Sequence, residues 1–351
     1  MNILKTKILL SNHMPTWAFL FLVRTYRLLG RALLNSPILK RSANLLALRV
    51  AQRSLTAHDR MSLAASGNLK LRRWNEAFEC DEQADGSRTI DLAWVHKPVG
   101  GNFGDWLSPY LTHKASGRRL RHVDLSDARR SRHLLSLGSI ITRANSQSIV
   151  LGSGINSLKD SVNPSARYLM VRGHFTREAL PPSARSENLV CCDPGFFVSE
   201  LYTPKQLPRA SARLLIPHIN HHNLFQAIGD EDFEILSANV SHPHDLEDLI
   251  DRIASADEVI TSAMHIFVVC CAYGVRCALI KPENADIRVP GDGVKYRDCM
   301  SPVLSEDFFP TEINVRKGIR LRDEIGSKIY EISRDHIRAS FNMFSYTLEN
   351  V

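Results

Sequence analysis

One stretch of the chain, Asp257–Ile280, constrains the fold more than any other. Three apolar segments, with a glycine before the last, predict a strand over Glu258–Thr261, a helix over Ser262–Tyr273 and a second strand over Cys277–Ile280. A helix that is apolar on nearly every face is normally buried inside a large protein. The stretch therefore predicts a buried, right-handed βαβ unit of a parallel sheet.

His265 is the side chain that interrupts the apolar surface of this predicted helix, and it lies in the first turn. Ligands of open α/β sheets bind beyond the carboxyl ends of the strands, where Thr261, Ser262 and His265 fall. Helix N-termini also attract anions. Two interpretations follow: a site residue beside an anionic substrate, or a core histidine with satisfied hydrogen bonds. The pattern alone does not decide between them.

Alternating strands and helices are predicted over most of the chain. The first half has predicted strands at Ile90–Val95, Leu120–Val123, His133–Ile141, Ser148–Gly152, Ala166–Arg172 and Asn188–Cys192, with helices at Ser108–Ser116 and Phe175–Leu180. The second half adds strands at Arg213–Ile216 and Phe233–Ser237 and an amphipathic helix at His244–Ala256. We predict an α/β fold with two Rossmann-like doubly wound domains facing a cleft, at residues 59–205 and 206–310, and C-terminal helices at 311–351.

The positive charge of the chain is concentrated before residue 59. Residues 1–58 contain nine lysines and arginines and no acidic residue, whereas the net charge of the whole chain is +7. The high pI thus arises from this arm and does not indicate nucleic-acid binding. Its longest apolar run, Trp17–Val23, is too short to span a bilayer. We predict a basic amphipathic helical arm at an anionic membrane surface; the alternative is a helix packed against the protein itself or a partner.

The cysteines and histidines show no metal-binding spacing. The seven cysteines include no Cys-X-X-Cys pair and are odd in number, which is typical of reduced thiols in a cytosolic protein. His218, His221 and His222 cluster, but no cysteine or carboxylate at close spacing completes a ligand set. We therefore predict neither a metal nor another resident cofactor.

A glycine-rich segment, Gly100-Gly101-Asn102-Phe103-Gly104-Asp105, follows the first predicted strand. Its glycines allow a ligand to approach the backbone closely. The spacing is that of neither a dinucleotide-binding fingerprint nor a P-loop. Asp105 is a candidate for positioning or deprotonating a hydroxyl group; the alternative is a tight turn in which Asp105 caps a helix.

Three further segments carry groups suited to anions. Gly152-Ser153-Gly154 follows a predicted strand and is a candidate phosphate-binding turn. Arg172 and Arg177 lie close to a strand end, and guanidinium groups bind carboxylates and phosphates in a bidentate manner. Arg177 is alternatively solvated or paired with Glu178. Lys295 lies in a predicted loop, where it either reaches a phosphate across the cleft or is exposed to solvent.

Several short segments, taken in order, resemble the polysaccharide pyruvyl transferase family. They are Asn102-Phe-Gly-Asp105-Trp-Leu-Ser-Pro109, Leu137-Gly-Ser-Ile140, Leu151-Gly-Ser-Gly154-Ile, Val171-Arg-Gly-His-Phe-Thr-Arg177-Glu, Cys192-Asp-Pro-Gly195, Ile216-Pro-His218, and Ile260-Thr-Ser-Ala-Met-His265 with Ala272-Tyr-Gly274. The resemblance covers about residues 90–300 and rests on the number and order of the segments. His174, Cys192, Ala263 and Ile266 depart from the family pattern, which bears on acceptor specificity more than on the fold.

The resemblance implies a two-domain fold similar to GT-B glycosyltransferases and the transfer of pyruvate from phosphoenolpyruvate to two hydroxyl groups of a sugar, giving a ketal. Phosphoenolpyruvate carries a carboxylate and a phosphate, so its site requires cations and helix N-termini. C3 of the donor must gain a proton while an acceptor hydroxyl loses one. The site therefore also requires an acid and a base.

The resemblance also assigns roles to the candidate residues. His265 is then an acid/base residue or a contact to the leaving phosphate, and Asp105 orients or deprotonates the acceptor. The predicted donor-binding residues are Arg172, Arg177, Gly152, Ser153, Gly154, Ser262 and Lys295, and the predicted acceptor-binding residues are Asn102 and His218.

The expected substrate is a lipid-linked or nascent exopolysaccharide repeat of a bacterium, and the expected location is cytoplasmic, with peripheral attachment to the inner face of the membrane. Two alternatives are considered. One is a GT-B-type nucleotide-sugar glycosyltransferase, which requires a glutamate or paired basic residues near Ser262, where only His265 is evident. The other is a non-catalytic assembly factor that has kept the fold.

Overall fold

The computed structural model describes residues 89–95, 101–124, 131–205, 207, 212–228, 232–240, 242–283, 289–314, 321 and 325–351. The chain divides into two units, Met1–Asn68 and Leu69–Val351, and the described residues all belong to the second. The predicted basic arm at residues 1–58 lies outside the described residues. Within the described ranges, no helix is long and apolar enough to cross a membrane.

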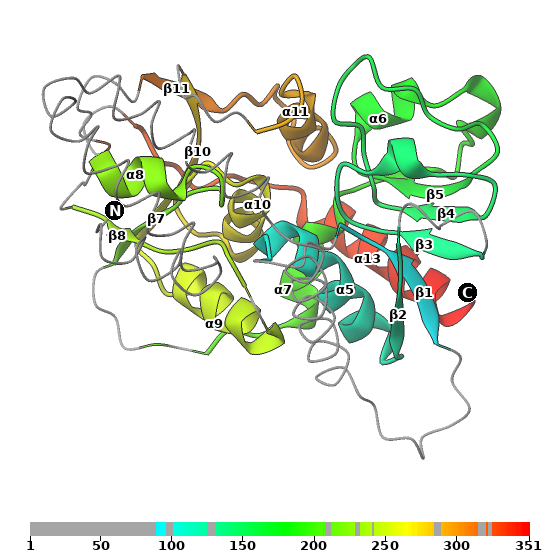
Figure 1. Ribbon diagram of the computed structural model, residues 1–351, viewed down its shortest axis with the longest axis horizontal. Coiled ribbons are helices and arrows are strands. Elements are labelled where there is room, and N and C mark those ends of the chain that lie inside the picture. Colours follow the sequence, from blue (N-terminus) through cyan, green and yellow to red (C-terminus); the bar gives the residue numbers. More distant parts are fainter. Residues whose placement is uncertain are drawn as a thin grey trace, which may run out of the picture. The chain divides into compact units, whose positions relative to one another are not determined.

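A parallel sheet of six strands forms the first lobe of this unit (Figure 1). The strands lie in the order β2-β1-β3-β4-β5-β6. Their bounds are Ile90–Ala93 for β1, Leu120–Val123 for β2, His133–Leu135 for β3, Ser148–Leu151 for β4, Arg167–Val171 for β5 and Val190–Cys191 for β6. The predicted strand at His133–Ile141 is shortened, because the chain leaves the sheet after Leu135 and turns at Gly138 with a φ of 119°.

A second parallel sheet, of five strands, forms the second lobe in the order β11-β10-β9-β7-β8. The bounds are Arg213–Ile216 for β7, Glu234–Ile235 for β8, Glu258–Thr261 for β9, Cys277–Glu283 for β10 and Thr311–Asn314 for β11. The two parallel sheets with their helices confirm the predicted α/β class. Within the region 311–351, for which C-terminal helices are predicted, Thr311–Asn314 is a strand that pairs with the end of β10.

The two sheets share one topological feature. In each sheet, the strand that comes first in the sequence lies between the second and the third strand. The direction in which successive strands are added therefore reverses next to this first strand. The reversal lies between β1 and β3 in the first lobe and between β7 and β9 in the second. Ligands of doubly wound sheets bind at this switch point, beyond the carboxyl ends of the strands. Both lobes therefore place their ligand-binding edges at the loops that follow β1, β3, β7 and β9.

The βαβ unit of the second lobe closely follows its prediction. Strand β9 has the predicted bounds, and helix α10 covers Met264–Tyr273. The hydroxyl of Thr261 accepts a hydrogen bond from the Ala263 amide at 3.0 Å and donates one to the Ile216 carbonyl at 2.6 Å. These bonds hold the chain in a turn before the helix, which therefore starts later than predicted. Gly274 ends the helix in the left-handed conformation, with a φ of 69°.

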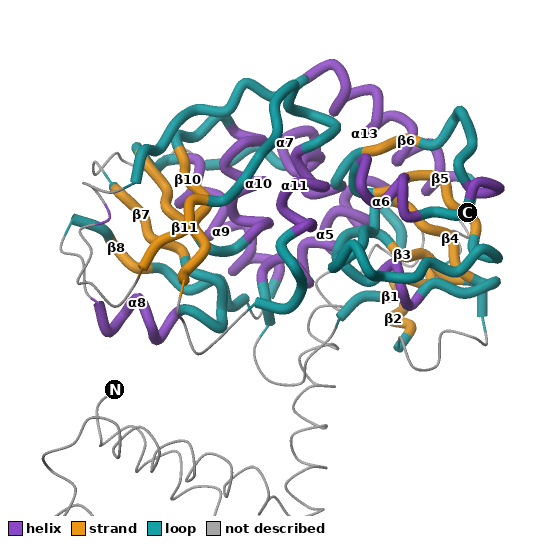
Figure 2. Tube along the Cα trace, turned by 90° about the horizontal axis from the view of Figure 1, so that it is seen from above, coloured by secondary structure: helices purple, strands orange, loops and turns teal. Residues whose placement is uncertain are grey.

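Helices lie between the two sheets, as Figure 2 shows. They include α5 (Phe103–Ser116), α7 (Val198–Leu201), α9 (Pro243–Ala254) and α10. A single hydrophobic core joins side chains of both lobes, among them Trp106, Leu214 and Phe267. Burial of each large apolar side chain contributes roughly 1.5–3 kcal/mol. The two lobes are therefore held together by a common core.

The C-terminal helix α13 (Arg334–Glu349) packs on elements of the first lobe, although it follows the second in sequence. The ring centroids of Phe344 and Phe197 lie 5.2 Å apart. His336 Nε2 lies 2.8 Å from the carbonyl of Cys191, and Arg118 donates a hydrogen bond to the carbonyl of Leu348 at 3.0 Å. The end of the chain thus contributes to the first lobe.

The structure differs most from the predictions at helices α5 and α11. Helix α5 was predicted to begin near Ser108-Pro109, but it begins at Phe103, with Asn102 as its extended N-cap, and Pro109 lies inside it. Gly104 and Asp105 are therefore helical and do not belong to the glycine loop. Lys295 was placed in a loop, but it lies in helix α11 (Val294–Met300).

The remaining short helical segments are η1 (Ile141–Arg143), α6 (His174–Ala179), η2 (Pro182–Ala184), η3 (Pro194–Phe197) and α8 (His222–Ile228). Six cysteines lie within the described residues, and all are buried as free thiols.

Candidate active site

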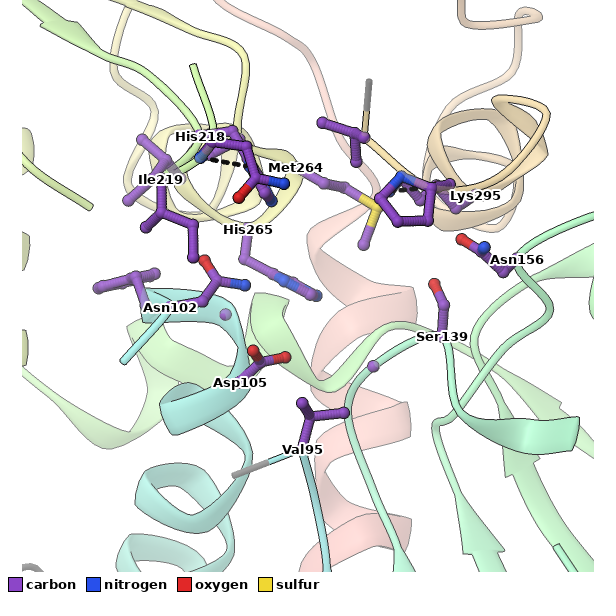
Figure 3. A pocket seen from close by; sticks show the side chains of 18 of the residues that line it. Val95, Asn102, Asp105, Ser139, Asn156, His218, Ile219, Met264, His265 and Lys295 are labelled. Atoms are coloured by element: carbon purple, nitrogen blue, oxygen red, sulfur yellow. Dashed lines mark hydrogen bonds between the residues drawn. The ribbon is translucent and has the colours of Figure 1, made fainter. Parts of the chain in front are cut away.

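A cavity of about 280 Å³ lies where the switch points of the two sheets meet (Figure 3). Four short segments contribute most of its lining, and each follows one of the strands that flank a switch point. After β1 these residues are Val95 and Asn102–Asp105, after β3 Gly138–Ile140, after β7 His218–Asn220, and after β9 Ala263–Ile266. Asn156, Val289, Pro290, Lys295 and Tyr296 complete the lining. The fold therefore assembles one site from both lobes.

The cavity contains five of the predicted site residues: Asn102, Asp105, His218, His265 and Lys295. Figure 3 shows Asn102, Asp105 and His265 grouped on one side of the cavity, and Lys295 on the other. Acid, base and cation candidates thus share one space, although they come from segments far apart in the sequence.

The position of His265 is fixed from two sides. Its ring lies against Gly104, the second residue of helix α5, so closely that a methyl group on Gly104 would overlap Nδ1. On the inner side, Nε2 of the ring lies 3.8 Å from Oδ2 of Asp193. Only 13% of the His265 side chain is exposed. The ring of this α10 histidine is therefore held in the wall between helix α5 and the start of η3.

Asn102 is positioned by pairing between the two lobes. It forms an isolated antiparallel bridge with Asn239. The amide of Phe103 donates to the carbonyl of Ala238 at 2.9 Å, and the amide of Val240 donates to the carbonyl of Gly101 at 2.8 Å. These bonds bring the glycine-rich segment, and Asp105 with it, against the second lobe.

Ser262 does not line the cavity but supports a segment that does. Its hydroxyl oxygen accepts a hydrogen bond from the His218 amide at 3.0 Å and lies 2.9 Å from Nδ1 of His221. His218 Nδ1 in turn accepts a bond from the Asn220 amide at 3.2 Å. The histidines therefore belong to a hydrogen-bonded loop. In the described part of the chain, no group of three or more histidine, cysteine or carboxylate side chains is arranged to hold a metal ion.

Lys295 is a half-buried cation in the cavity wall. Its Nζ donates a hydrogen bond to the carbonyl of Pro290 at 3.3 Å. Burial, reinforced by the guanidinium of Arg172 and partly opposed by Asp105, lowers the pKa of Lys295 to about 8. The lysine is therefore largely charged at pH 7 and loses its charge at a pH not far above it.

Arg172 lies behind the wall of the cavity and does not line it. Its side chain is fully buried, with Nε 2.8 Å from Oδ2 of Asp298, Nη1 2.7 Å from Oγ of Ser139, and Nη2 bonded to the carbonyl of Ile155. Asp298 belongs to helix α11, so this ion pair fastens α11 to the end of β5. Ser139 lines the cavity, so only the Ser139 side chain separates the charge of Arg172 from the cavity.

The other predicted donor-binding residues lie outside the cavity lining. Arg177 is half-buried in helix α6. Gly152, Ser153 and Gly154 are buried behind the loop that follows β3, where the Ser153 hydroxyl and the Gly154 amide both donate to the carbonyl of Gly138, at 2.8 and 3.0 Å. This turn braces the lining residues Gly138–Ile140 from behind.

Asp193 is a site component that sequence reasoning missed. In the sequence it is evident only as part of the segment Cys192-Asp-Pro-Gly195, and its Oδ1 caps η3 by accepting the Gly195 amide at 2.8 Å. Its other carboxylate oxygen faces His265. Burial raises the pKa of Asp193, but His265, Arg172 and the Gly195 amide together outweigh burial and hold that pKa below its ordinary value. The sequence signal that could have identified Asp193 as a site residue is its position at the end of a buried strand.

Comparison with known proteins identifies one family. A family model described as "Polysaccharide pyruvyl transferase" matches residues 99–284, which is more than half of the 351-residue chain. No curated protein matches the sequence. Among solved structures, an uncharacterized protein from Klebsiella pneumoniae subsp. pneumoniae is similar, with 12% identity and a TM-score of 0.35, over 68% of this chain and 93% of that one. The range matched by the family model includes every predicted site residue except Lys295.

Proposed function

Because this chain belongs to the polysaccharide pyruvyl transferase family, we propose that it transfers pyruvate from phosphoenolpyruvate to two hydroxyl groups of one sugar, forming a ketal and releasing inorganic phosphate. The observation that carries the proposal is the joint cavity, in which His265, Asp105 and Lys295 meet at the switch points of both sheets. The proposed architecture is similar to that of GT-B glycosyltransferases, which also bind their substrates between two domains.

The cavity suits a small dianionic or trianionic donor. Helices α5 and α10 both begin in its wall, and helix geometry leaves the first-turn amides of α10 without partners inside the helix. Such N-termini favour phosphate and carboxylate groups. Lys295 adds a positive charge, and Arg172 supplies a second one from behind Ser139. We assign the donor to these groups.

The proposed reaction moves two protons from the acceptor hydroxyls, one to C3 of the donor and one to the leaving phosphate. One acceptor hydroxyl attacks C2 of phosphoenolpyruvate while C3 gains a proton, which converts the methylene group into a methyl group. The second hydroxyl then attacks C2, the C2–O bond to phosphate breaks, and the remaining proton leaves with the phosphate. We assign proton uptake from the acceptor to Asp105 and proton donation to His265, with Asn102 and His218 as acceptor contacts.

The proposed acceptor is a sugar of a lipid-linked or nascent exopolysaccharide repeat unit. An acceptor of this kind lies at the inner face of a bacterial membrane. The nine positive charges of residues 1–58 suit attachment to that anionic surface. No resident cofactor is required, because phosphoenolpyruvate supplies both the pyruvate and the leaving group.

The direct test is to incubate the purified full-length protein with phosphoenolpyruvate and a membrane glycolipid extract, and to measure inorganic phosphate. We expect phosphate release that depends on the acceptor, together with an acceptor mass increase that corresponds to a pyruvate ketal. A parallel incubation with a panel of nucleotide sugars should release no nucleoside diphosphate. Release of nucleoside diphosphate instead of phosphate would contradict the proposal.

Replacing Gly104 with alanine is expected to lower kcat by about 10²-fold, because displacing a reacting group by about 1 Å has an effect of that size. The added methyl group overlaps Nδ1 of His265, so the ring must leave its position against Gly104. The melting temperature should change little, since alanine favours a helix over glycine by about 0.5–1 kcal/mol.

The matched control for this variant is Gly326→Ala, because a methyl group on Gly326 meets no atom within 4 Å. Both variants are compared by phosphate release and by calorimetry. Unchanged kcat in Gly104→Ala would show that the close contact does not position His265.

The activity is expected to depend on the protonation of Lys295. Since its pKa is about 8, kcat/KM for phosphoenolpyruvate should fall as the pH rises through about 8. Lys295→Arg should hold its kcat/KM over that range, because a guanidinium stays charged, and Lys295→Met should lower kcat/KM at pH 7 by about 10-fold or more. A pH profile of the three proteins tests this. If Lys295→Arg falls with pH like the wild type, another group is responsible.

A further inference from the structure

Two buried polar groups in the wall of the cavity are oriented towards each other. The Asp193 side chain is fully buried, and its Oδ2 lies 3.8 Å from Nε2 of His265. That nitrogen is also buried, and it has no hydrogen-bond partner within 3.5 Å among the described residues. A buried polar atom without a partner costs about 1–3 kcal/mol, so an arrangement of this kind requires an explanation.

The carboxylate of Asp193 is held rigidly. Oδ1 accepts the Gly195 amide at 2.8 Å, and the thiol of Cys299 lies 3.5 Å from Oδ2. Gly195 has no room for a side chain, since a methyl group there would lie 3.0 Å from Val268 and 2.9 Å from Asp193 itself. Helix α10, which carries His265, packs directly on η3, which begins at the residue after Asp193. The carboxylate and the imidazole are therefore fixed by the same contact between elements.

We propose that Asp193 is a positioning residue for His265, an inference that rests on the proposed function. The carboxylate fixes the neutral ring with its proton on Nε2, and it stabilises the imidazolium when the ring is charged. This leaves Nδ1, on the Gly104 side of the ring, to exchange a proton with a ligand in the cavity. A carboxylate that orients a catalytic histidine has this role in other enzymes, where it selects the tautomer and does not itself take up the proton.

Three other charged groups lie near Asp193 and His265. Arg172, at the end of β5, favours the charged form of Asp193. Asp105 on α5 and Lys295 on α11 line the same cavity as His265 and carry opposite charges. Asp193 is distinguished from Asp105 by complete burial and by its place behind the ring. It therefore suits positioning, whereas Asp105 is accessible to a substrate.

The test compares Asp193→Asn with Asp251→Asn. An asparagine at 193 keeps the acceptor for the Gly195 amide but loses the charge. Asp251 is also a buried carboxylate, with Tyr202 and the Lys205 amide as donors at 2.9 Å, and it does not line the cavity. We expect Asp193→Asn to lower kcat about 10²-fold or more, with KM for phosphoenolpyruvate changed less than about threefold, and Asp251→Asn to leave kcat unchanged.

A second measurement needs no substrate. The ¹⁵N chemical shifts of the His265 ring in the ligand-free wild type, recorded where the ring is neutral, report which nitrogen carries the proton. We expect the Nε2–H tautomer in the wild type and in Asp251→Asn, and a mixture in Asp193→Asn. A wild-type ring protonated on Nδ1, or a kcat of Asp193→Asn within about threefold of the wild type, would overturn the proposal. If the wild type releases no phosphate, the proposed function fails, but the tautomer still tests the positioning role.

Discussion

Replacement of His265 by glutamine is expected to lower kcat for acceptor-dependent phosphate release by about 10²–10⁴-fold, the usual contribution of a positioned proton donor. Glutamine is similar in size and keeps a polar end group, but it cannot transfer a proton. The ring lies in the cavity wall between Gly104 and Asp193, so the substitution removes the group at the centre of the proposed site.

The control is His336→Gln, which changes a half-buried, hydrogen-bonded histidine of α13 that does not line the cavity. Its kcat should equal that of the wild type. The kinetic constants also separate two roles for His265. Loss of kcat with an unchanged KM indicates proton transfer, whereas a KM raised tenfold or more at constant kcat would contradict it and assign His265 to binding of the donor phosphate.

Replacement of Asp298 by alanine is expected to lower the free energy of unfolding by about 3–5 kcal/mol, because it leaves the charge of Arg172 buried without a partner. Both side chains of this pair are fully buried. The carboxylate of Asp298 also accepts hydrogen bonds from the amide and the hydroxyl of Thr176, at 2.8 and 2.6 Å. The substitution therefore removes the acceptor of three donors at once.

Urea denaturation at pH 7 measures this loss, and Asp307→Ala is the matched control. Asp307 pairs with Arg297 of the same helix α11 at 3.5 Å, but its side chain is 69% exposed, so its removal should cost less than about 1 kcal/mol. The double variant Arg172→Met, Asp298→Leu should recover the part of the loss that comes from the unpaired charge. It should not recover the part that comes from the two Thr176 donors, which still lack an acceptor. A loss below about 1 kcal/mol in Asp298→Ala would contradict the role of the pair.

The parts of the fold that depend on local patterns were predictable from the sequence. The strands β2, β7 and β9 have their predicted bounds. In β7 and β9 a short apolar run carries the signal. The rule that ligands bind beyond the carboxyl ends of parallel strands drew attention to His265, and the structure places this residue in the wall of a cavity beyond the end of β9. The resemblance to a family, based on short segments in order, is confirmed by the family model.

The parts that depend on distant partners were not predictable. Arg172 was interpreted as a donor ligand, but its partner Asp298 lies 126 positions further along the chain, in a segment adjoining a predicted loop. Asp193 faces His265 only because η3 packs on α10, and no periodicity encodes that contact. Pro109 suggested a helix start, yet the helix begins earlier, since burial between the two lobes outweighs the loss of one backbone hydrogen bond.

The core that both lobes share determines how the molecule can be divided. Sequence order suggests two modules, but helix α5 is buried on nearly all sides from Phe103 to Thr112, and helix α13 returns from the end of the chain to cover the first lobe. A fragment cut between the sheets would expose these apolar surfaces to water and favour aggregation. Chimeras that exchange acceptor specificity must therefore exchange loops around the cavity, and not whole lobes.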